Sequence, residues 1–510
     1  MYANVMSVGL NGLMGYLSCV EVDVTKTMPG FDMVGSLSKE VKEAKERVRV
    51  ALKNSEINIG PVRITVNISP ADIRKEGTAY DLPIAVGIMV ALGCVSYETI
   101  ADICFVGELG LNGEVKPISG VLPRVICARK QGIKKCVVPF ENYNEARKIP
   151  GIMIVGIRDF RQVMELLQNR VKMNEFCKNE KYESVIGENK IYCDDFSDVL
   201  GQEAGKRVAS IAASGFHHML LMGPPGSGKT MIAKRMVGIM PPMTEEEMLE
   251  VSAVYSICGK LSKENPMITE RPFVAIHHTV TANALVGGGV VPKPGAISLS
   301  HNGILFLDEL PEFSRESIEA LRQPLEEKEI HITRNKGDVI YPADFMLVSS
   351  CNLCPCGFYP NRKKCRCTQR DIERYLNKIS LPIRERIDLC VTTNKIEIKE
   401  LTDYKKTKNT EEIKGIVMKA REIQERRFRG TNIRFNGNIP ANAVGKYCLL
   451  GKKEKDYVNT LFPAMQMSAR AYHKVLRIAR TIADMEGENN IGISHLAEAV
   501  CYRLQEIKGD

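Results

Sequence analysis

Three features of exported, membrane and fibrous proteins are missing from this sequence. No Lys or Arg precedes Lys26, so the first residues lack the basic start of a secretory signal. The longest apolar run, Leu82 to Val95, contains a proline and two glycines and is too short to span a bilayer, so we expect a buried helix there. There are no internal repeats and no low-complexity tracts. We therefore expect a cytoplasmic globular protein with no membrane partner, whose sixteen cysteines are mostly reduced thiols.

The composition is that of an ordinary globular chain with a slight excess of positive charge. Of the 510 residues 44% are hydrophobic, and 70 Lys and Arg against 61 Asp and Glu leave a net charge of +9. This length predicts about three domains, and the small excess is compatible with an acidic polymer as partner without identifying one. The apolar pattern predicts an α/β domain at 1–175, a polar linker at 176–195, a second α/β region at 196–395 and a helical, basic region at 396–510.

The first domain shows the two-residue period of half-buried strands. Apolar and polar residues alternate in three places, around Val20, Val22 and Val24, at Ile57 and Ile59, and at Ile64, Val66 and Ile68. Between the first two strands, apolar residues from Val41 to Leu52 fall at helical spacing. Two apolar runs flank Asn112-Gly113, which is a strong signal for a β-hairpin.

A phosphate-binding loop is predicted at residues 223–230, which match the pattern G-x-x-x-x-G-K-[ST]. The loop follows an apolar run, a predicted strand, and precedes a helix start. Glycines let backbone N–H groups wrap the phosphates, and a helix N-terminus favours their negative charge. We expect Lys229 to reach the β- and γ-phosphates of ATP and Thr230 to hold Mg²⁺. The predicted nucleotide-binding residues are Gly223, Pro224, Pro225, Gly226, Ser227, Gly228, Lys229 and Thr230.

An apolar strand from Ile304 to Leu307 ends in two acids, Asp308 and Glu309. Adjacent carboxylates at a strand end are costly unless a cation or a polar site uses them. Beside a P-loop, Asp308 suits Mg²⁺ binding, and Glu309 suits polarising the water that attacks the phosphate.

Five longer motifs occur in order along the chain. They are Pro272-Phe-Val-Ala-Ile-His-His-Thr, Gly287-Gly-Gly, Asn302-Gly-Ile-Leu-Phe-Leu-Asp-Glu-Leu, Cys354-Pro-Cys-Gly and Arg386-Ile-Asp. Together they resemble the ComM/YifB family of magnesium-chelatase-like AAA+ ATPases, over essentially the whole chain. The resemblance implies a P-loop α/β core with a parallel sheet, a C-terminal helical lid, and hydrolysis of ATP with Mg²⁺.

The same resemblance implies three more catalytic residues besides Lys229 and Glu309. Asn352 matches the sensor-1 position, although the next residue is Leu353 where the family usually has proline. Arg386 is similar to the arginine finger, which reaches the ATP of a neighbouring subunit, and Arg470 is similar to sensor 2 on the lid. Such cations neutralise charge on the phosphoryl group in the transition state. A finger supplied to a neighbour requires an oligomer, and the resemblance implies a homohexameric ring.

The N-terminal domain resembles the proteolytic domain of Lon in the motifs 105–118 and 132–139. That domain needs a Ser nucleophile and a Lys base. Laying the segment 75–81 on the Lon nucleophile motif puts Ala79 at the serine, and the segment aligned with the lysine, 120–124, ends in Arg124. We therefore expect a Lon-like (S5-like) α/β domain that binds or assembles, without peptidase activity.

Four cysteines, Cys354, Cys356, Cys365 and Cys367, fall within 14 positions and suit a tetrahedral Zn²⁺ site. The C-x-C spacing is less usual than C-x₂-C, and Cys351 could replace one ligand. A reduced loop without metal is the alternative. The pair His277-His278 is expected to be structural, because adjacent residues on a strand face opposite ways.

The substrate is predicted from the basic residues. Seven Lys and Arg lie between 362 and 378, and a second basic stretch contains Lys405, Lys406, Lys408 and the arginines from 421 to 429. A predicted hairpin carries Arg334 and Lys336 at its tip, where related ring ATPases have a loop that points into the pore. We expect a DNA translocase, and the resemblance implies a helicase that drives branch migration in natural transformation. A metal-inserting subunit like that of magnesium chelatase and a MoxR-like protein remodeller remain alternatives.

Overall fold

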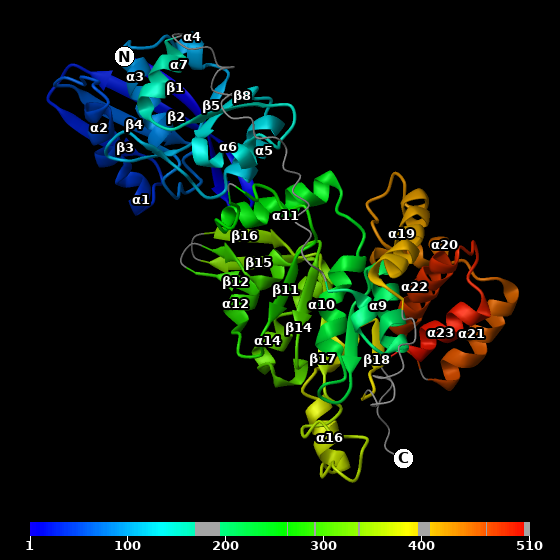
Figure 1. The fold of residues 1–510 in the computed structure, drawn as a ribbon. Helices are drawn as coiled ribbons and strands as arrows, with labels where there is room; N and C mark the ends of the chain where they lie inside the picture. The colour runs from blue at the N-terminus through cyan, green and yellow to red at the C-terminus, as the bar shows by residue number, and fades with distance from the viewer. Residues whose placement is uncertain are drawn as a thin grey trace.

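The computed structural model describes residues 1–168, 194–262, 264–289, 292–334, 337–395, 408–465 and 467–503. The linker expected at 176–195 therefore lies outside the described residues, apart from its last two positions. Figure 1 shows an elongated molecule with the N-terminal domain at one end, a parallel-sheet core in the middle and a group of C-terminal helices beside the core.

A seven-stranded mixed sheet forms the centre of the N-terminal domain, with its strands in the order β3-β4-β2-β1-β5-β8-β9. Apolar residues of β2 and β4 alternate onto the buried face, so the strands expected around Val22 and Val66 are confirmed. The strands are β1 (Tyr2–Asn11), β2 (Met14–Thr25), β3 (Gly30–Val34), β4 (Arg63–Ser69), β5 (Ile103–Phe105), β8 (Lys135–Pro139) and β9 (Met153–Ile157).

Helices pack on this sheet, among them α3 (Asp81–Ala91), in which every residue is buried. Complete burial explains the apolar run in the sequence, because a helix covered on all sides needs no polar face. The helix expected between Val41 and Leu52 is present but interrupted at Glu43, as α1 (Lys39–Lys42) and α2 (Ala44–Asn54).

One predicted strand of this domain is wrong. Ile57 and Ile59 lie in the loop between α2 and β4, where Gly60 adopts a φ of 67° and Pro61 follows. A left-handed glycine and a proline end any extended run, so the alternation of two isoleucines was too short to indicate a strand. The hairpin expected at Asn112-Gly113 is present as β6 (Glu108–Leu109) paired antiparallel with β7 (Val115–Lys116).

The core contains a five-stranded parallel sheet in the order β11-β14-β17-β10-β18. Its strands are short and mostly buried on both faces, as parallel strands between helices are. Their carboxyl ends lie at one edge, which is where α/β sheets bind ligands. The strands are β10 (Met219–Met222), β11 (Phe273–Ile276), β14 (Ile304–Leu307), β17 (Met346–Cys351) and β18 (Leu389–Thr392), and helices α9 (Glu203–Gly215), α10 (Lys229–Ile239) and α11 (Glu245–Ile257) belong to the same body.

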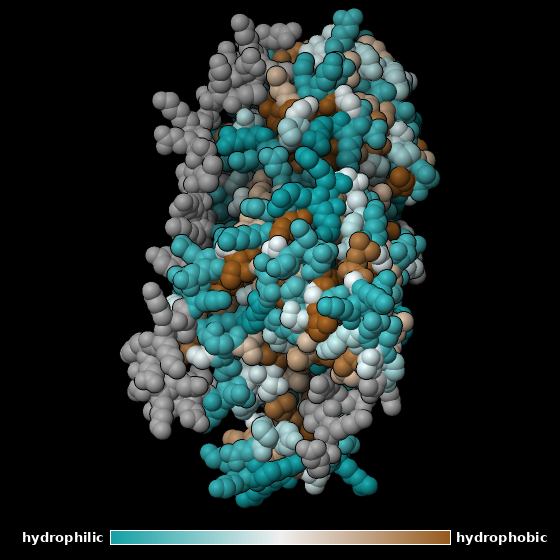
Figure 2. Space-filling model, turned by 90° about the vertical axis from the view of Figure 1, so that its right-hand side faces the viewer, coloured by the Kyte–Doolittle hydropathy of each residue, from teal (hydrophilic) through white to brown (hydrophobic). Residues whose placement is uncertain are grey.

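Two elements extend from the core. A hairpin of β15 (Glu329–Arg334) and β16 (Gly337–Pro342) precedes β17, as expected. Helix α16 (Gln369–Leu376) projects from the end of the molecule opposite the N-terminal domain (Figure 1). Figure 2, turned about the vertical axis, shows a strongly hydrophilic surface at this lower end of the molecule.

The C-terminal part forms helices and turns, with no strand in its described residues, 408–465 and 467–503. Its longer helices are α19 (Thr410–Arg427), α21 (Lys452–Ala464), α22 (Ala469–Glu486) and α23 (Ile493–Cys501). A buried carboxylate, Asp484, ties α22 to α19 by accepting a 2.6 Å hydrogen bond from Arg427. In the described parts of the chain, no helix is both long and apolar enough to cross a membrane.

The N-terminal domain contacts the core at two places. The backbone N–H of Gly120 donates to the carbonyl of Ser256 on α11 at 3.0 Å, and the Ser256 hydroxyl donates to Glu145 at 3.0 Å. The turn after β1 lies beside the hairpin, where the Asn11 amide donates to the carbonyl of Asp338 on β16 at 3.5 Å. These contacts place the N-terminal domain next to the hairpin.

Candidate nucleotide site

Three of the predicted site segments come together because each follows a neighbouring strand of the parallel sheet. The P-loop follows β10, Asp308 follows β14, and Asn352 follows β17. Since parallel strands end at the same edge, residues far apart in sequence meet there. The Lys229 ammonium donates to the Asn352 side-chain oxygen at 3.3 Å.

The P-loop holds Lys229 as the first residue of α10. Gly228, at φ 84°, turns the chain into the helix in a left-handed conformation that favours glycine. The Lys229 ammonium donates to the loop carbonyls of Gly223 at 2.8 Å and Pro224 at 2.9 Å. Burial lowers the pKa of Lys229. A partly desolvated cation inside a loop of N–H groups is suited to bind phosphate.

Thr230 and Asp308 fit a shared Mg²⁺ ion. The Thr230 hydroxyl lies 3.0 Å from a carboxylate oxygen of Asp308. Two neighbouring ligands of an octahedral Mg²⁺ ion at 2.0–2.1 Å are about 2.9 Å apart, so these two oxygens already have the spacing the ion requires. The other carboxylate oxygen accepts a short hydrogen bond from the Ser350 hydroxyl, which orients the group.

Glu309 is held in a left-handed backbone conformation, at φ 57°, and its side chain is half exposed. Its backbone N–H donates to the Ser350 hydroxyl at 3.1 Å. The His278 ring nitrogen Nδ1 lies 3.8 Å from the Glu309 carboxylate. A non-glycine residue at positive φ is costly, and such strain is typical of functional positions. The carboxylate therefore stays accessible to water while its backbone is fixed.

The strand argument for treating His277 and His278 as structural is wrong. Both residues follow β11 instead of lying on it, and their rings pack together with centroids 4.0 Å apart. Strand alternation does not apply outside the strand, so His278 is free to face Glu309. His277 contacts the Thr279 hydroxyl at 3.1 Å.

Ser350 and Thr393 belong to the site although no motif marks them. The Thr393 hydroxyl lies 2.7 Å from that of Ser227, and its backbone N–H donates to the carbonyl of Met222 at 2.6 Å. Thr393 directly follows β18, the strand paired with β10, so it supports the P-loop from the side. Thr393 is a polar residue that directly follows an apolar strand, and this pattern could have identified it from the sequence.

Arg386 and Arg470 lie together, away from the P-loop. Arg386 precedes β18 and so is at the opposite edge of the sheet from Lys229. It makes a short ion pair with Glu326 on α15 (Arg322–Glu327) and donates to the carbonyl of Pro382 at 2.7 Å. Arg470, at the start of α22, is 3.9 Å from the same Glu326. Among the described residues, no hydrogen bond or ion pair joins either arginine to the P-loop or to Asp308 and Glu309.

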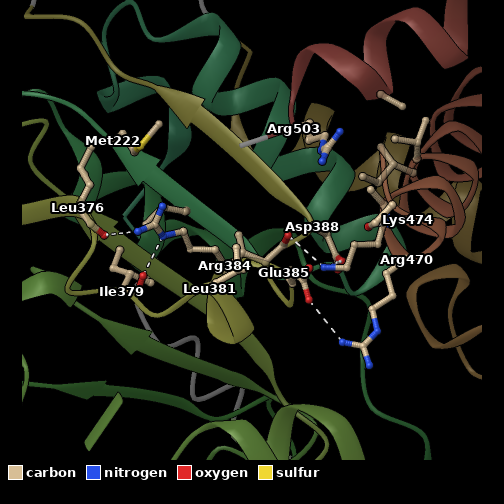
Figure 3. Close-up of a pocket in the computed structure, with 17 residues that line it drawn as sticks. Met222, Leu376, Ile379, Leu381, Arg384, Glu385, Asp388, Arg470, Lys474 and Arg503 are labelled. Atoms are coloured by element: carbon tan, nitrogen blue, oxygen red, sulfur yellow. Dashed lines mark hydrogen bonds and ion pairs between the residues drawn. The ribbon is translucent and has the colours of Figure 1, made fainter. Parts of the chain in front are cut away.

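A cavity of about 210 Å³ lies between the core and the lid, and Arg470 is one of the residues that line it. In Figure 3 Arg470 reaches Glu385 across it, at 3.4 Å, and Lys474 reaches Asp388, at 2.8 Å. These ion pairs join α22 to the segment that carries Arg386. Helix α22 and the segment that carries Arg386 are therefore expected to move together.

The four predicted zinc ligands lie within 4.8 Å of one another. They are Cys354, Cys356, Cys365 and Cys367, and each offers one sulfur atom. Cys351 is not part of the group, because its thiol is buried in the core at the end of β17. Of the two possible ligand sets, the geometry favours the one without Cys351.

The predicted DNA contacts are only partly described. Arg334 is the last residue of β15, but its side chain is not described. Three other predicted basic residues, Lys336, Lys405 and Lys406, lie outside the described residues. In the second basic stretch, Arg421 is buried and pairs with Glu425 at 3.0 Å, and Arg427 pairs with Asp484. These two arginines hold the lid together, so they do not add to a basic surface.

The positions aligned with the Lon dyad are buried in the N-terminal domain. Ala79 is 2% exposed, and Arg124 is 6% exposed and donates to the carbonyl of Val8. Burial lowers the pKa of Arg124. Nearby, the hydroxyls of Tyr16 and Tyr80 lie 3.4 Å apart.

The sequence matches three related family profiles. They are described as "Magnesium chelatase, subunit ChlI" over residues 195–401, "Subunit ChlI of Mg-chelatase" over residues 20–142, and "Magnesium chelatase, subunit ChlI C-terminal" over residues 407–503.

Similar proteins extend over nearly the whole chain. Competence protein ComM of Haemophilus influenzae is 38% identical over 96% of this chain and 95% of its own length. YifB of Escherichia coli is 37% identical over 95% of this chain and 93% of its own length. Lon protease 2 of Bacillus subtilis is 32% identical over 27% of this chain and 26% of its own length. With the P-loop, the parallel sheet and the helical C-terminal part described above, these similarities show that the chain belongs to the ComM/YifB family of magnesium-chelatase-like AAA+ proteins.

Proposed function

We propose that this protein is a ring-forming ATPase that moves DNA. Membership of an AAA+ family implies ATP and Mg²⁺ as cofactors. The observation that carries the ATPase proposal is the convergence of Lys229, Thr230, Asp308 and Asn352 at one sheet edge. Glu309 stands beside them with an accessible carboxylate.

Each residue has a distinct role in the proposed reaction. Lys229 and the loop N–H groups bind the β- and γ-phosphates, and Thr230 and Asp308 would hold Mg²⁺, which would supply positive charge beside the transferred phosphate. Glu309 orients and polarises the attacking water, and Asn352 donates its amide to the γ-phosphate or that water. His278, next to Glu309, positions that carboxylate.

The arginines support an assembly in which subunits share sites. Arg386 and Arg470 lie at the sheet edge opposite the P-loop, so we propose that they act on the ATP of a neighbouring subunit. Within the subunit, ion pairs to Glu326 and Glu385 hold these two side chains in place. By resemblance to the family we propose a homohexameric ring in the cytoplasm.

DNA is the proposed substrate for two reasons. A similar protein is named as a competence protein. In addition, seven exposed Lys and Arg surround α16, and phosphates are natural partners for such a surface. We propose that Arg334 and Lys336, at the turn of the hairpin before β17, contact DNA in the pore. The activity would be branch migration in natural transformation or recombination.

The test is the ATPase rate of the purified protein with and without single-stranded and branched DNA. We expect stimulation that weakens as salt rises, because phosphate contacts release counterions. Inorganic polyphosphate at the same phosphate concentration is the control for any polyanion, and it should stimulate less. If no DNA binding is seen even at low salt, the DNA proposal fails. Metal insertion, favoured by the chelatase profiles, or protein remodelling would then take its place.

A further inference from the structure

The four sulfur atoms of the cysteine cluster have the arrangement of a metal site. The sulfur of Cys354 lies 3.3 Å from that of Cys356 and 3.7 Å from that of Cys365, and the last two are 3.6 Å apart. Tetrahedral zinc with Zn–S bonds of 2.3 Å requires sulfurs about 3.8 Å apart. A disulfide would require about 2.05 Å. These three distances, with the Cys367 sulfur within 4.8 Å of each of the other three, are compatible with four ligands around one ion.

The segment that carries the cluster has little apolar core of its own. Cys354, Cys365 and Ile372 form its small buried group, with Tyr359, Cys367 and Leu376 packed against them. Such a small unit usually needs a metal or a disulfide to keep one conformation. The backbone N–H of Tyr359 donates to the Cys354 sulfur at 3.4 Å, a bond that orients this sulfur.

The cluster contacts the P-loop directly. Gly357 follows the second cysteine at φ 78°, and a β-carbon there would lie 2.8 Å from Cδ and 2.9 Å from Cγ of Pro225. Cys354 also comes two residues after Asn352, which contacts Lys229. The turn of the cluster is therefore packed between the P-loop and the end of the sensor-1 strand.

The other side of the cluster leads into α16. Thr368 follows the last cysteine and caps the helix, and its side chain accepts a hydrogen bond from the backbone N–H of Asp371 at 3.2 Å. Ile372 on the first turn packs against the cysteines. One ion at this position would thus join the ATP site to the basic helix.

We propose that Cys354, Cys356, Cys365 and Cys367 bind one zinc ion that fixes the turn packed on the P-loop, so that loss of zinc weakens nucleotide binding. All four candidate ligands are cysteine sulfurs within 4.8 Å of one another, and sulfur ligands favour zinc over the oxygen-preferring Mg²⁺ and Ca²⁺. The proposal concerns metal and nucleotide only, and it stands whether or not DNA is the substrate.

The first experiment is metal analysis of the purified full-length protein, with Cys365→Ser as the variant. Cys94→Ser is the matched control, because Cys94 is an exposed thiol of the N-terminal domain. We expect about one zinc per chain in the parent and the control, and loss of zinc in Cys365→Ser. Co²⁺ substitution should give the visible bands of a tetrahedral thiolate site. A parent protein that neither contains nor takes up zinc, contains iron instead, or keeps zinc in Cys365→Ser overturns the site.

The second experiment measures the affinity for a fluorescent ATP analogue. We expect about tenfold weaker binding after a chelator removes zinc from the parent, and recovery when zinc is added back. Gly357→Val keeps all four thiols, so it should retain zinc and still bind nucleotide about tenfold more weakly, because its side chain displaces Pro225. Unchanged affinity in both cases overturns the link between the cluster and the P-loop. A parent that binds zinc but no nucleotide would contradict the proposed function and leave the metal site standing.

Discussion

A subunit-mixing experiment tests whether Arg386 acts on the ATP of a neighbouring subunit. Lys229→Ala removes the phosphate contact but leaves the finger, and Arg386→Ala does the reverse. In the structure, Leu389 pairs with Met219 at the start of two four-residue strands, and the P-loop begins after their other end. Such strands span about 13 Å. Arg386 is moreover held by Glu326, so it does not complete the site of its own chain.

Each variant alone should therefore be almost inactive, since losing a finger costs about 10³–10⁵ in turnover. In rings formed from equal amounts of both, each interface has about one chance in four of joining an intact P-loop to an intact finger, so about a quarter of the parent rate returns. This fraction does not depend on the number of subunits if interfaces work independently. The assay is phosphate release after the two proteins are mixed, unfolded partially and allowed to reassemble.

A mixture of Lys229→Ala with Glu309→Gln is the matched control. Both lesions affect the same edge of the sheet, so no interface is complete and no activity should return. The same mixing with Arg470→Ala tests the lid arginine. If Lys229→Ala and Arg386→Ala together are no more active than the average of the two alone, the finger does not act between subunits and the reasoning is refuted.

Three further predictions concern the site, the hairpin and the lid. Lys229→Ala should abolish ATP hydrolysis, whereas Glu309→Gln should bind ATP normally without hydrolysing it. Binding of a fluorescent nucleotide and release of phosphate are the two measurements. Normal turnover in Glu309→Gln would remove this residue from the mechanism. The double variant Arg334→Ala/Lys336→Ala should keep basal ATPase activity and assembly but lose stimulation by DNA. The slope of DNA affinity against salt concentration should fall by about one for each phosphate that is no longer neutralised. Strand movement at the parent rate would contradict the proposed role of the hairpin. Asp484→Asn should lower the free energy of unfolding of the lid by about 3 kcal/mol in denaturant titrations, because it leaves the buried Arg480 and the half-buried Arg427 without their carboxylate. A change below about 1 kcal/mol would show that these ion pairs are not structural.

The contiguous parts of the site could be predicted from the sequence alone. The P-loop is a local structure, in which the glycines, Lys229 and Thr230 act within one short segment, between a strand and a helix that their own apolar pattern reveals. Asp308 and Glu309 are recognisable in the same way, at the end of an apolar strand. The four cysteines are recognisable by their number within 14 positions, because metal ligands close in sequence need only a short turn to meet.

The tertiary structure decided what joins these parts. The site also contains Ser350, Thr393 and His278, which come together because β17, β18 and β11 lie in one parallel sheet. The order of strands in a sheet cannot be predicted from the spacing of residues within one segment. Arg421 and Arg427 resemble a basic surface in sequence, but helix packing buries one and pairs the other with Asp484. Arg386 and Arg470 both contact Glu326 at the edge of the sheet away from the P-loop. Local sequence specifies only the element that carries each arginine, whereas the packing of the elements determines what its side chain contacts.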